Sequence, residues 1–233
     1  MSDLVKIAKT EISNSNKLCV IAGLNVLEDD QLTFEVAERL KKITEAQGNS
    51  FIFKASFDKA NRSSVDSYRG PGLEKGLEIF RELKKSDYQL ITDIHEISQV
   101  EQISEVVDII QIPAFLCRQT DLIKEACQSG KPLNIKKGQF LSPDQMKNII
   151  EKCSNFGNDQ IMLCERGTSF GYDNLVVDML GMSKLKTFKC PIIFDVTHSL
   201  QLPGQGKTAA GGRGEQAEDL AKAGVSLGIA GLF

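Results

Sequence analysis

The stretch SFIFKASFDKANRSS (50–64), followed by LEKGLEIFRELKKS (73–86) and YQLITDI (88–94), carries the pattern that decides the fold. Its first and last parts contain short apolar runs rich in β-branched and aromatic residues, which is typical of buried strands. Its middle part repeats apolar residues at the helical period. A strand, a helix and a second strand at this spacing predict a parallel βα unit rather than a hairpin.

The same alternation extends outward from this unit to both ends of the chain. Apolar runs of the strand type are LCVIAG (18–23), SFIFKAS (50–56), YQLITDI (88–94), VDIIQIP (107–113), PLNIKKG (132–138), QIMLCER (160–166), PIIFDVT (191–197) and VSLGIAGLF (225–233). Amphipathic helices are predicted between them, at 32–47, 73–86 and 142–155 among others, the last with Ser142 as N-cap and Pro143 at its first position. Eight strands with alternating helices predict an α/β fold of the (β/α)8 TIM-barrel type. A doubly wound open sheet has the same periodicity and is the alternative.

Both ends of the chain are expected to depart from a plain barrel. Residues 5–12, VKIAKTEI, alternate weakly, which predicts a short N-terminal hairpin across the bottom of the barrel. Phe233 directly follows the eighth predicted strand, so the last helix of an ordinary barrel is expected to be absent from the given chain. The length predicts a single domain that comprises residues 1–233.

Composition excludes several classes of function. The 28 basic and 31 acidic residues nearly cancel, and tyrosine and tryptophan are scarce, so no footprint for nucleic acid or an anionic membrane is present. No apolar run approaches the roughly 18 residues that span a bilayer, and the first residues lack the apolar core of a secretion signal, which predicts a cytoplasmic protein. The six cysteines form no Cys-x-x-Cys pair and are predicted to be reduced packing residues.

Polar side chains gather where the predicted strands end, which in a parallel barrel is the mouth that carries the chemistry. They are Lys54, Ser56, Lys59, Asn61, Arg62 and Ser63 after the second strand, Asp93 and His95 after the third, Gln111 on the fourth, Lys136 and Lys137 on the fifth, Glu165 and Arg166 on the sixth, and Asp195 and His198 on the seventh. The cations expected to converge are Lys54, Lys59, Arg62, Lys137 and Arg166. Crowded cations repel one another unless multivalent anions are bound, so phosphate and carboxylate groups are the predicted ligands.

Two glycine-rich segments follow the seventh predicted strand. Residues 211–214 are expected to form a mobile loop that carries Arg213 and could close the mouth as a lid. QLPGQGKT (201–208) ends like a phosphate-binding P-loop but lacks its first glycine and does not join a strand directly to a helix. Nucleotide binding is therefore not predicted.

The chain resembles the 3-deoxy-D-manno-octulosonate 8-phosphate synthases in a series of motifs that run in order between Asn25 and Phe233. These motifs are FKASFDKANRSS (53–64), SYRGPGLEKGL (67–77), TDIHE (92–96), QIPAFLCRQTDL (111–122), NIKKGQF (134–140), CERGTSFGYDNLVVDML (164–180) and FDVTHSLQ (194–201). The resemblance implies a transferase that condenses phosphoenolpyruvate with D-arabinose 5-phosphate and water. Its products are 3-deoxy-D-manno-octulosonate 8-phosphate and inorganic phosphate, in lipopolysaccharide biosynthesis.

The resemblance also implies roles for individual residues. Phosphoenolpyruvate would be surrounded by Lys54, Lys59, Lys137, Gln139, Arg166 and His198. The pentose phosphate would be held by Ser56, Asn61, Arg62, Ser63, Gln111 and Arg118, with Arg118 reaching in from a neighbouring subunit of a homotetramer. Candidates for proton transfer and the positioning of water are Asn25, Lys59, Asp93, His95 and His198.

The prediction about whether the protein needs a metal ion depends on Asn25. The resembled family has a metal-dependent branch with a cysteine shortly after the first strand and a metal-independent branch with an asparagine there. Asn25 in AGLNVLE (22–28) has no thiolate for a soft divalent cation, so no metal and no other cofactor is predicted. Two departures from the family are expected to matter: Gly138 replaces a common proline, and the acidic and histidine residues usual after strand eight would follow Phe233.

Two alternatives remain open from the sequence. The related 3-deoxy-7-phosphoheptulonate synthases use the same enol donor with erythrose 4-phosphate, but they usually carry Lys-Pro-Arg-Thr where this chain has Lys-Ala-Asn-Arg-Ser-Ser (59–64). A catalytically silent barrel that only binds sugar phosphates would keep the cations without turnover. In each case the predicted partners are small molecules, with no nucleic acid and no membrane.

Overall fold

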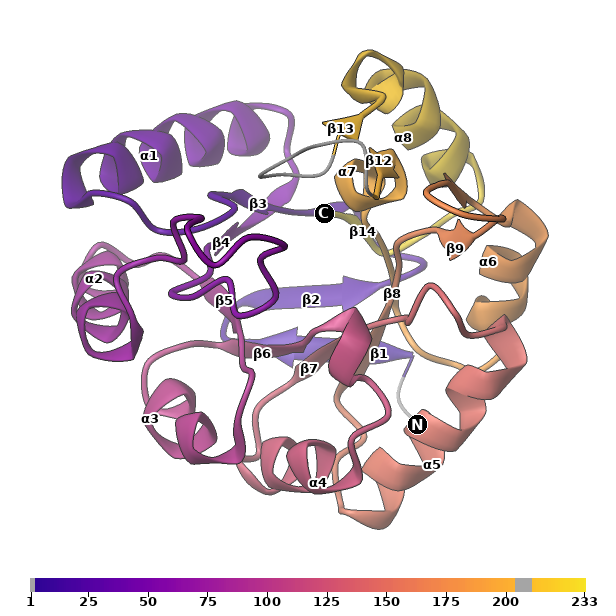
Figure 1. The fold of residues 1–233 in the computed structure, drawn as a ribbon, viewed down its shortest axis with the longest axis horizontal. Helices are drawn as coiled ribbons and strands as arrows, with labels where there is room; N and C mark the ends of the chain where they lie inside the picture. Colours follow the sequence, from indigo (N-terminus) through magenta and orange to yellow (C-terminus); the bar gives the residue numbers. More distant parts are fainter. Residues whose placement is uncertain (1–2, 204–210) are drawn as a thin grey trace.

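The computed structural model describes residues 3–203 and 211–233. Within these residues, parallel strands close into an eight-stranded barrel with the helices outside it (Figure 1). The barrel strands are β3 (Cys19–Gly23), β4 (Ser50–Lys54), β5 (Leu90–Asp93), β6 (Ile109–Ile112), β7 (Leu133–Lys136), β8 (Ile161–Glu165), β11 (Ile192–Phe194) and β14 (Gly231–Leu232). Because β14 pairs with both β11 and β3, the sheet has no free edge. The predicted TIM barrel is confirmed and the open-sheet alternative is excluded.

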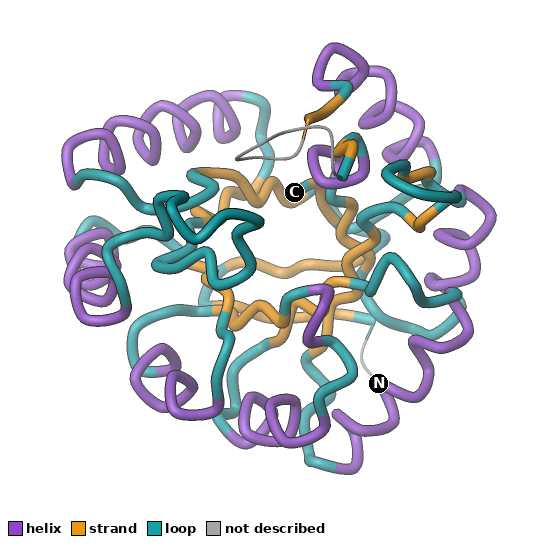
Figure 2. Tube along the Cα trace, viewed as in Figure 1, coloured by secondary structure: helices purple, strands orange, loops and turns teal. Residues whose placement is uncertain are grey.

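Helices form the outer ring that Figure 2 shows around the strands. The α-helices are α1 (Asp30–Ala46), α2 (Leu73–Lys85), α3 (Val100–Ser104), α4 (Thr120–Gln128), α5 (Met146–Asn155), α6 (Met179–Lys186), α7 (Val196–Ser199) and α8 (Ala217–Ser226). Short 3-10 helices are η1 (Ile97–Gln99), η2 (Ala114–Leu116), η3 (Pro143–Gln145) and η4 (Gly214–Gln216). The predicted helix start at Ser142 is confirmed, since Ser142 and Gln145 form a capping box. No described helix has the length and apolar character needed to cross a membrane.

Two apolar layers hold the barrel together. Outward-facing strand residues such as Phe53, Ile135 and Phe194 pack under the helices, whereas inward-facing residues such as Ile52 and Ile193 fill the barrel interior. Burial of both faces explains why the strands are nearly continuous apolar runs in the sequence. All six cysteines are free and buried, as predicted.

The predicted N-terminal hairpin is confirmed and closes one end of the barrel. Strand β1 (Leu4–Ile7) pairs antiparallel with β2 (Thr10–Ser13) and lies behind the barrel in Figure 1. Val5, Ile7 and Ile12 of the hairpin join the inner apolar cluster. The hairpin therefore seals the bottom, and the loops after the carboxyl ends of the strands form the other end, the mouth.

Two expectations near the end of the chain are corrected. The predicted strand at 225–233 begins too early, because Val225 lies in the last turn of α8 and Gly228, at φ +64°, turns the chain before β14. Residues 211–214 begin with a short strand, β13 (Gly211–Gly212), paired with β12 (Gln201–Leu202). Residues 204–210, between these two strands, lie outside the described residues, and so does most of the P-loop-like segment 201–208.

Candidate active site at the barrel mouth

Strand alternation aims charged side chains into the barrel mouth. Ile52 and Ile193 face the barrel interior, so Lys54 and Asp195, two residues further along, face it as well. Asp93 follows the same rule at the end of β5. These three charged residues are at most 5% exposed. The strands thus place charged groups directly above an apolar interior, where water screens them poorly.

Asp93 is the centre of the first polar group. Its Oδ1 accepts a hydrogen bond from Ser56 Oγ and lies 3.6 Å from Lys54 Nζ, and its Oδ2 lies 3.3 Å from His95 Nε2. Lys54 Nζ also donates to Ser56 Oγ at 2.6 Å. Burial alone would raise the pKa of Asp93, but the charge of Lys54 and the hydrogen bond from His95 hold that pKa well below its usual value. Asp93 is therefore a permanent anion.

Asp195 is the centre of a second group on the neighbouring side of the barrel. It accepts a hydrogen bond from Lys136 Nζ and lies 2.7 Å from His198 Nδ1, a close contact without hydrogen-bond alignment. As the N-cap of α7 it also accepts the His198 amide at 2.9 Å. Asp195 raises the pKa of His198, but Lys136 and burial outweigh it and lower that pKa. The imidazole is thus neutral near pH 7, with Nδ1 facing the carboxylate.

Among the described residues, cations outnumber the anions available to them at the mouth. Burial lowers the pKa of Lys54 to about 7, and repulsion by Lys59 and Lys136 contributes to the shift. Burial and Lys136 also lower the pKa of Lys59. Arg166 is buried, and its Nε has no hydrogen-bond partner among the described residues. A mouth with mutually repelling ammonium groups and an unsatisfied guanidinium is suited to a multivalent anion.

Lys137 does not lie with these cations. Leu133 and Ile135 face the helices, so alternation turns Lys136 into the barrel and Lys137 away from it. Lys137 Nζ donates to Thr168 Oγ1 at 3.0 Å, outside the barrel. The structure therefore corrects the expectation that Lys137 faces the mouth, and Lys136 takes that position above the ring of Phe233, with Nζ 3.8 Å from the ring centroid.

The candidates for the pentose phosphate divide into loop residues and buried residues. Asn61, Arg62 and Ser63 lie in the loop between β4 and α2, which covers part of the mouth in Figure 1. Arg62 is half-buried and its Nε donates to Tyr68 O at 3.1 Å, which leaves its terminal nitrogens for a ligand. Ser56 and Gln111 are buried; Ser56 is engaged with Lys54 and Asp93, and Gln111 accepts from Asn134 at 3.3 Å.

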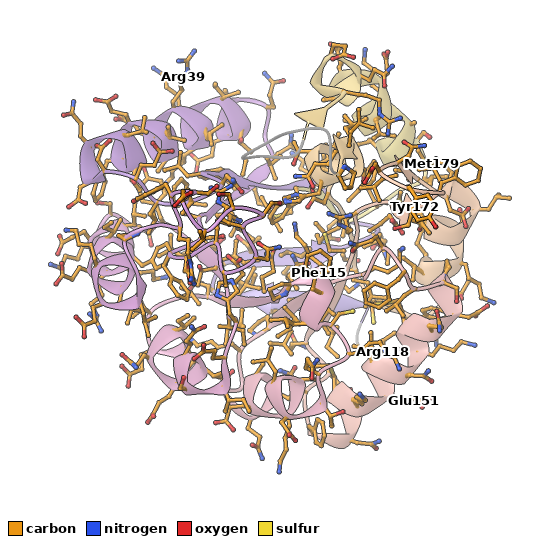
Figure 3. All side chains as sticks on the ribbon, viewed as in Figure 1. Arg39, Phe115, Arg118, Glu151, Tyr172 and Met179 are labelled. Atoms are coloured by element: carbon orange, nitrogen blue, oxygen red, sulfur yellow. The ribbon has the colours of Figure 1, made fainter. Side chains whose placement is uncertain are left out.

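The remaining candidates, Arg118, Asn25 and Gln139, belong to neither polar group. Arg118 is exposed, and its carbonyl accepts from Lys152 of α5 at 3.0 Å. Figure 3 shows Arg118 beside α5, away from the middle of the mouth. Asn25 is exposed in the loop that follows β3. Gln139 lies on the loop after β7, and its buried Oε1 has no hydrogen-bond partner in the described part of the chain.

With this geometry in view, comparison with known proteins identifies the family. A model of the DAHP synthetase I family matches residues 4–233. The chain belongs to the DAHP synthetase I family. It is 55% identical over 230 residues to a "2-dehydro-3-deoxyphosphooctonate aldolase" of Hahella chejuensis, a match that covers 98% of this chain and 82% of the relative. Relatives of the same name in Pseudomonas putida (strain GB-1) and Pseudomonas syringae pv. syringae are each 54% identical over 231 residues, 99% of this chain and 82% of the relative. The resemblance drawn from the motifs is confirmed.

Within this DAHP synthetase I fold, sequence reasoning missed the roles of Lys136 and Asp195. Both are polar residues at the ends of predicted strands, but the sequence motifs assign neither of them a role in the site. Counting alternate positions from Leu133 and Ile135 places Lys136 inside only once the structure shows that these two residues face the helices. The pairing of Lys136 with Asp195 was not available, since the two residues are 59 positions apart and only barrel closure brings them together.

A metal site is not apparent in the described residues. No three side chains of histidine, cysteine, aspartate or glutamate gather there in a way that would hold a metal ion. The role of Asn25 in excluding a metal remains a prediction that rests on the chemistry of its side chain.

Proposed function

We propose that this chain condenses phosphoenolpyruvate with D-arabinose 5-phosphate and water, giving 3-deoxy-D-manno-octulosonate 8-phosphate and inorganic phosphate. The observation that carries the proposal is the convergence of four cations, Lys54, Lys59, Lys136 and Arg166, on one mouth of a barrel whose relatives are named for this product. It is a transferase of lipopolysaccharide biosynthesis. Both substrates are charged phosphates that do not cross a bilayer unaided, so the proposed location is the cytoplasm.

The four cations suit the phosphate and carboxylate of phosphoenolpyruvate. Arg166, whose Nε has no hydrogen-bond partner among the described residues, can bind one of these groups in a bidentate manner, whereas Lys54, Lys59 and Lys136 act as point charges. Binding would relieve the repulsion among the lysines and supply the acceptor that Arg166 lacks. Gln139 and His198 complete the proposed set.

The pentose phosphate is assigned to the loop at 61–63. Arg62 supplies the charge, and the exposed side chains of Asn61 and Ser63 add neutral donors. Ser56 and Gln111 act mainly by fixing their neighbours, because both are buried and already hydrogen-bonded. This loop would place the aldehyde end of the sugar above the enol donor.

The chemistry requires charge stabilisation at two points. C3 of phosphoenolpyruvate attacks the aldehyde carbon, water adds at C2, and the resulting tetrahedral intermediate loses phosphate by cleavage of its C–O bond. The aldehyde oxygen takes up a proton and the attacking water gives one up. We assign these transfers to Lys59 and the neutral His198, and the orientation of the water to Asp93 with His95.

The reaction is proposed to proceed without a metal, with Asn25 beside the mouth in place of a thiolate ligand. Prolonged chelation should leave the rate of product formation unchanged. Loss of turnover on chelation, with recovery on addition of a divalent cation, would overturn this part of the proposal.

A homotetramer is proposed as the working assembly. Four exposed aromatic side chains follow strands β6, β7 and β8, namely Phe115, Phe140, Phe170 and Tyr172. Exposed aromatic groups are enriched at protein interfaces. Arg118, which is exposed three residues after Phe115, would reach the pentose phosphate of a neighbouring subunit. Sedimentation of the wild-type protein as a stable monomer with full activity would contradict this assembly.

The deciding experiment is a phosphate-release assay with each aldose. We expect turnover with arabinose 5-phosphate and little with erythrose 4-phosphate, because the 59–64 loop differs from that of the heptulosonate synthases. A preference for the four-carbon sugar would favour that alternative. Calorimetric binding of phosphoenolpyruvate without product from either sugar would favour the silent barrel.

A further inference from the structure

Lys137 carries a charge that the proposed chemistry does not use. It is 1% exposed and lies outside the barrel. Its Nζ donates to Thr168 Oγ1 at 3.0 Å and to Leu141 O at 3.3 Å, and it lies 3.6 Å from Glu165 Oε1. Burying an ammonium this deeply costs free energy that its partners must offset.

Glu165, the first partner of Lys137, is hydrogen-bonded to the backbone of Arg166. The oxygen of Glu165 nearest to Lys137, Oε1, also accepts the backbone amides of Arg166 at 2.9 Å and Gly167 at 2.7 Å. Gly167 has φ +89°, so the chain turns sharply there and needs this support. Glu165 faces outward and Arg166 inward, so an ion pair outside the barrel fixes the backbone from which the inner guanidinium projects.

Thr168, the second partner of Lys137, precedes Ser169, which is hydrogen-bonded to the backbone of Gln139. Strand β9 (Thr168–Ser169) pairs with β10 (Leu175–Val176), and the Ser169 amide donates to Gln139 O at 2.9 Å. Lys137 therefore ties the loop that carries Gln139 to the segment that follows Arg166. Within the described residues, Gln139 Oε1 and Arg166 Nε are both buried without a hydrogen-bond partner. The ammonium thus anchors the two segments that present unsatisfied groups.

We propose that Lys137 is a positioning residue that acts from outside the barrel, holding Glu165 and Thr168 so that Arg166 and Gln139 face the phosphoenolpyruvate site. The assignment rests on the proposed function for the identity of that ligand. Without the ammonium, Glu165 is a buried carboxylate that still attracts the Arg166 guanidinium, whose pKa it raises. The guanidinium would then be drawn from the ligand toward its own neighbour.

A double-variant experiment separates this role from direct contact with the substrate. Calorimetry gives the Kd of phosphoenolpyruvate and of arabinose 5-phosphate for Lys137→Met and for Lys137→Met combined with Glu165→Gln. We expect Lys137→Met to weaken phosphoenolpyruvate binding by about 100-fold and to change pentose binding by less than about threefold. The added Glu165→Gln should restore at least about tenfold of the lost affinity for phosphoenolpyruvate. The glutamine carbonyl oxygen still accepts hydrogen bonds from both backbone N–H groups, but the neutral side chain no longer attracts Arg166.

The matched control is Lys84→Met at the opposite end of the barrel. Lys84 Nζ lies 2.8 Å from Asp108 Oδ1, and Asp108 Oδ2 accepts the Leu90 amide at the start of β5, as Glu165 accepts amides at the end of β8. We expect Lys84→Met to leave both dissociation constants unchanged, since its ion pair supports no residue of the mouth.

Several outcomes would overturn the proposal. If the double variant binds phosphoenolpyruvate as weakly as Lys137→Met does, the ammonium contacts the ligand itself. If Lys137→Met binds phosphoenolpyruvate with an unchanged Kd, the ammonium positions nothing. If Lys137→Met does not fold, the double variant decides alone: binding within about tenfold of wild type supports positioning, and a loss near 100-fold overturns it. A wild-type chain that binds phosphoenolpyruvate without turnover contradicts the proposed function only, whereas one that does not bind it contradicts both.

Discussion

Two buried carboxylates organise the side chains of the mouth, each with one lysine and one histidine. The two groups are Asp93 with Lys54 and His95, and Asp195 with Lys136 and His198. Each carboxylate fixes the direction of its lysine and offsets part of the cost of burying it. Because Lys59 and Arg166 add charge without adding an anion, the free site is electrostatically incomplete until a ligand binds.

The depressed pKa of Lys54 predicts a proton linkage. Burial lowers this pKa from 10.5 to about 7, so in the free protein the ammonium loses its proton as the pH rises through about 7. An anionic ligand favours the charged form, so above pH 7 phosphoenolpyruvate binding should take up about one proton and weaken as the pH rises. Calorimetry in buffers of different ionisation enthalpy measures this uptake. In Lys54→Arg the cation cannot deprotonate, and uptake equal to wild type in that variant would refute the assignment.

Arg62 predicts a substrate-specific effect. A charge-assisted hydrogen bond is worth about 1.5–3 kcal/mol, so Arg62→Ala should raise the KM for arabinose 5-phosphate about 10-fold to 100-fold with little change for phosphoenolpyruvate. Steady-state kinetics with each substrate varied in turn checks this split. Arg39→Ala is the control, because Arg39 is exposed on α1 and points away from the mouth in Figure 3. Equal effects of Arg62→Ala on both substrates would contradict the assignment.

At the scale of elements, the sequence predicts the order and type of structure better than its boundaries or side-chain directions. The eight strands, the N-terminal hairpin and the capped helix at Ser142 follow from local patterns. The start of the eighth strand does not, since Val225 and the residues after Gly228 belong to one apolar run that only packing divides. Lys136 and Lys137 show the same limit: adjacent lysines in a strand buried on both faces give no polar side from which to read direction.

The junction of β11 and α7 predicts a large loss of stability in Asp195→Asn. Asparagine still caps α7, but it leaves the Lys136 ammonium buried without an anion, so the free energy of unfolding should fall by about 3–5 kcal/mol. Urea unfolding measures the change. Thr197→Val is the matched control, since Thr197 Oγ1 makes a single 3.2 Å hydrogen bond to Asp195 and its removal should cost about 0.5–1.5 kcal/mol. A loss below about 1 kcal/mol in Asp195→Asn would mean that Lys136 does not depend on this carboxylate.

Across the whole molecule, the two ends of the barrel have different tasks. At the bottom, the hairpin residues Val5, Ile7 and Ile12 join the inner apolar cluster and leave no polar site among the residues of that cluster. At the top, the same inward-facing rows of side chains continue as lysines and aspartates. The apolar interior beneath them keeps water out, which strengthens every charge interaction at the mouth.

This division predicts that stability and catalysis can be changed separately. Ile12 is 0% exposed within the inner cluster, so Ile12→Ala should lower the free energy of unfolding by about 2–5 kcal/mol through the cavity it leaves. Because the bottom contacts no substrate, the KM for both substrates should stay within about twofold at temperatures where the variant is folded. Ile43→Ala, at a site that is 55% exposed on α1, controls for the loss of an isoleucine and should change stability by less than about 0.5 kcal/mol. Urea unfolding and steady-state kinetics on the same preparations check both parts. A rise in either KM that accompanies the stability loss in Ile12→Ala would mean that packing at the bottom of the barrel sets the geometry of the cations at the mouth.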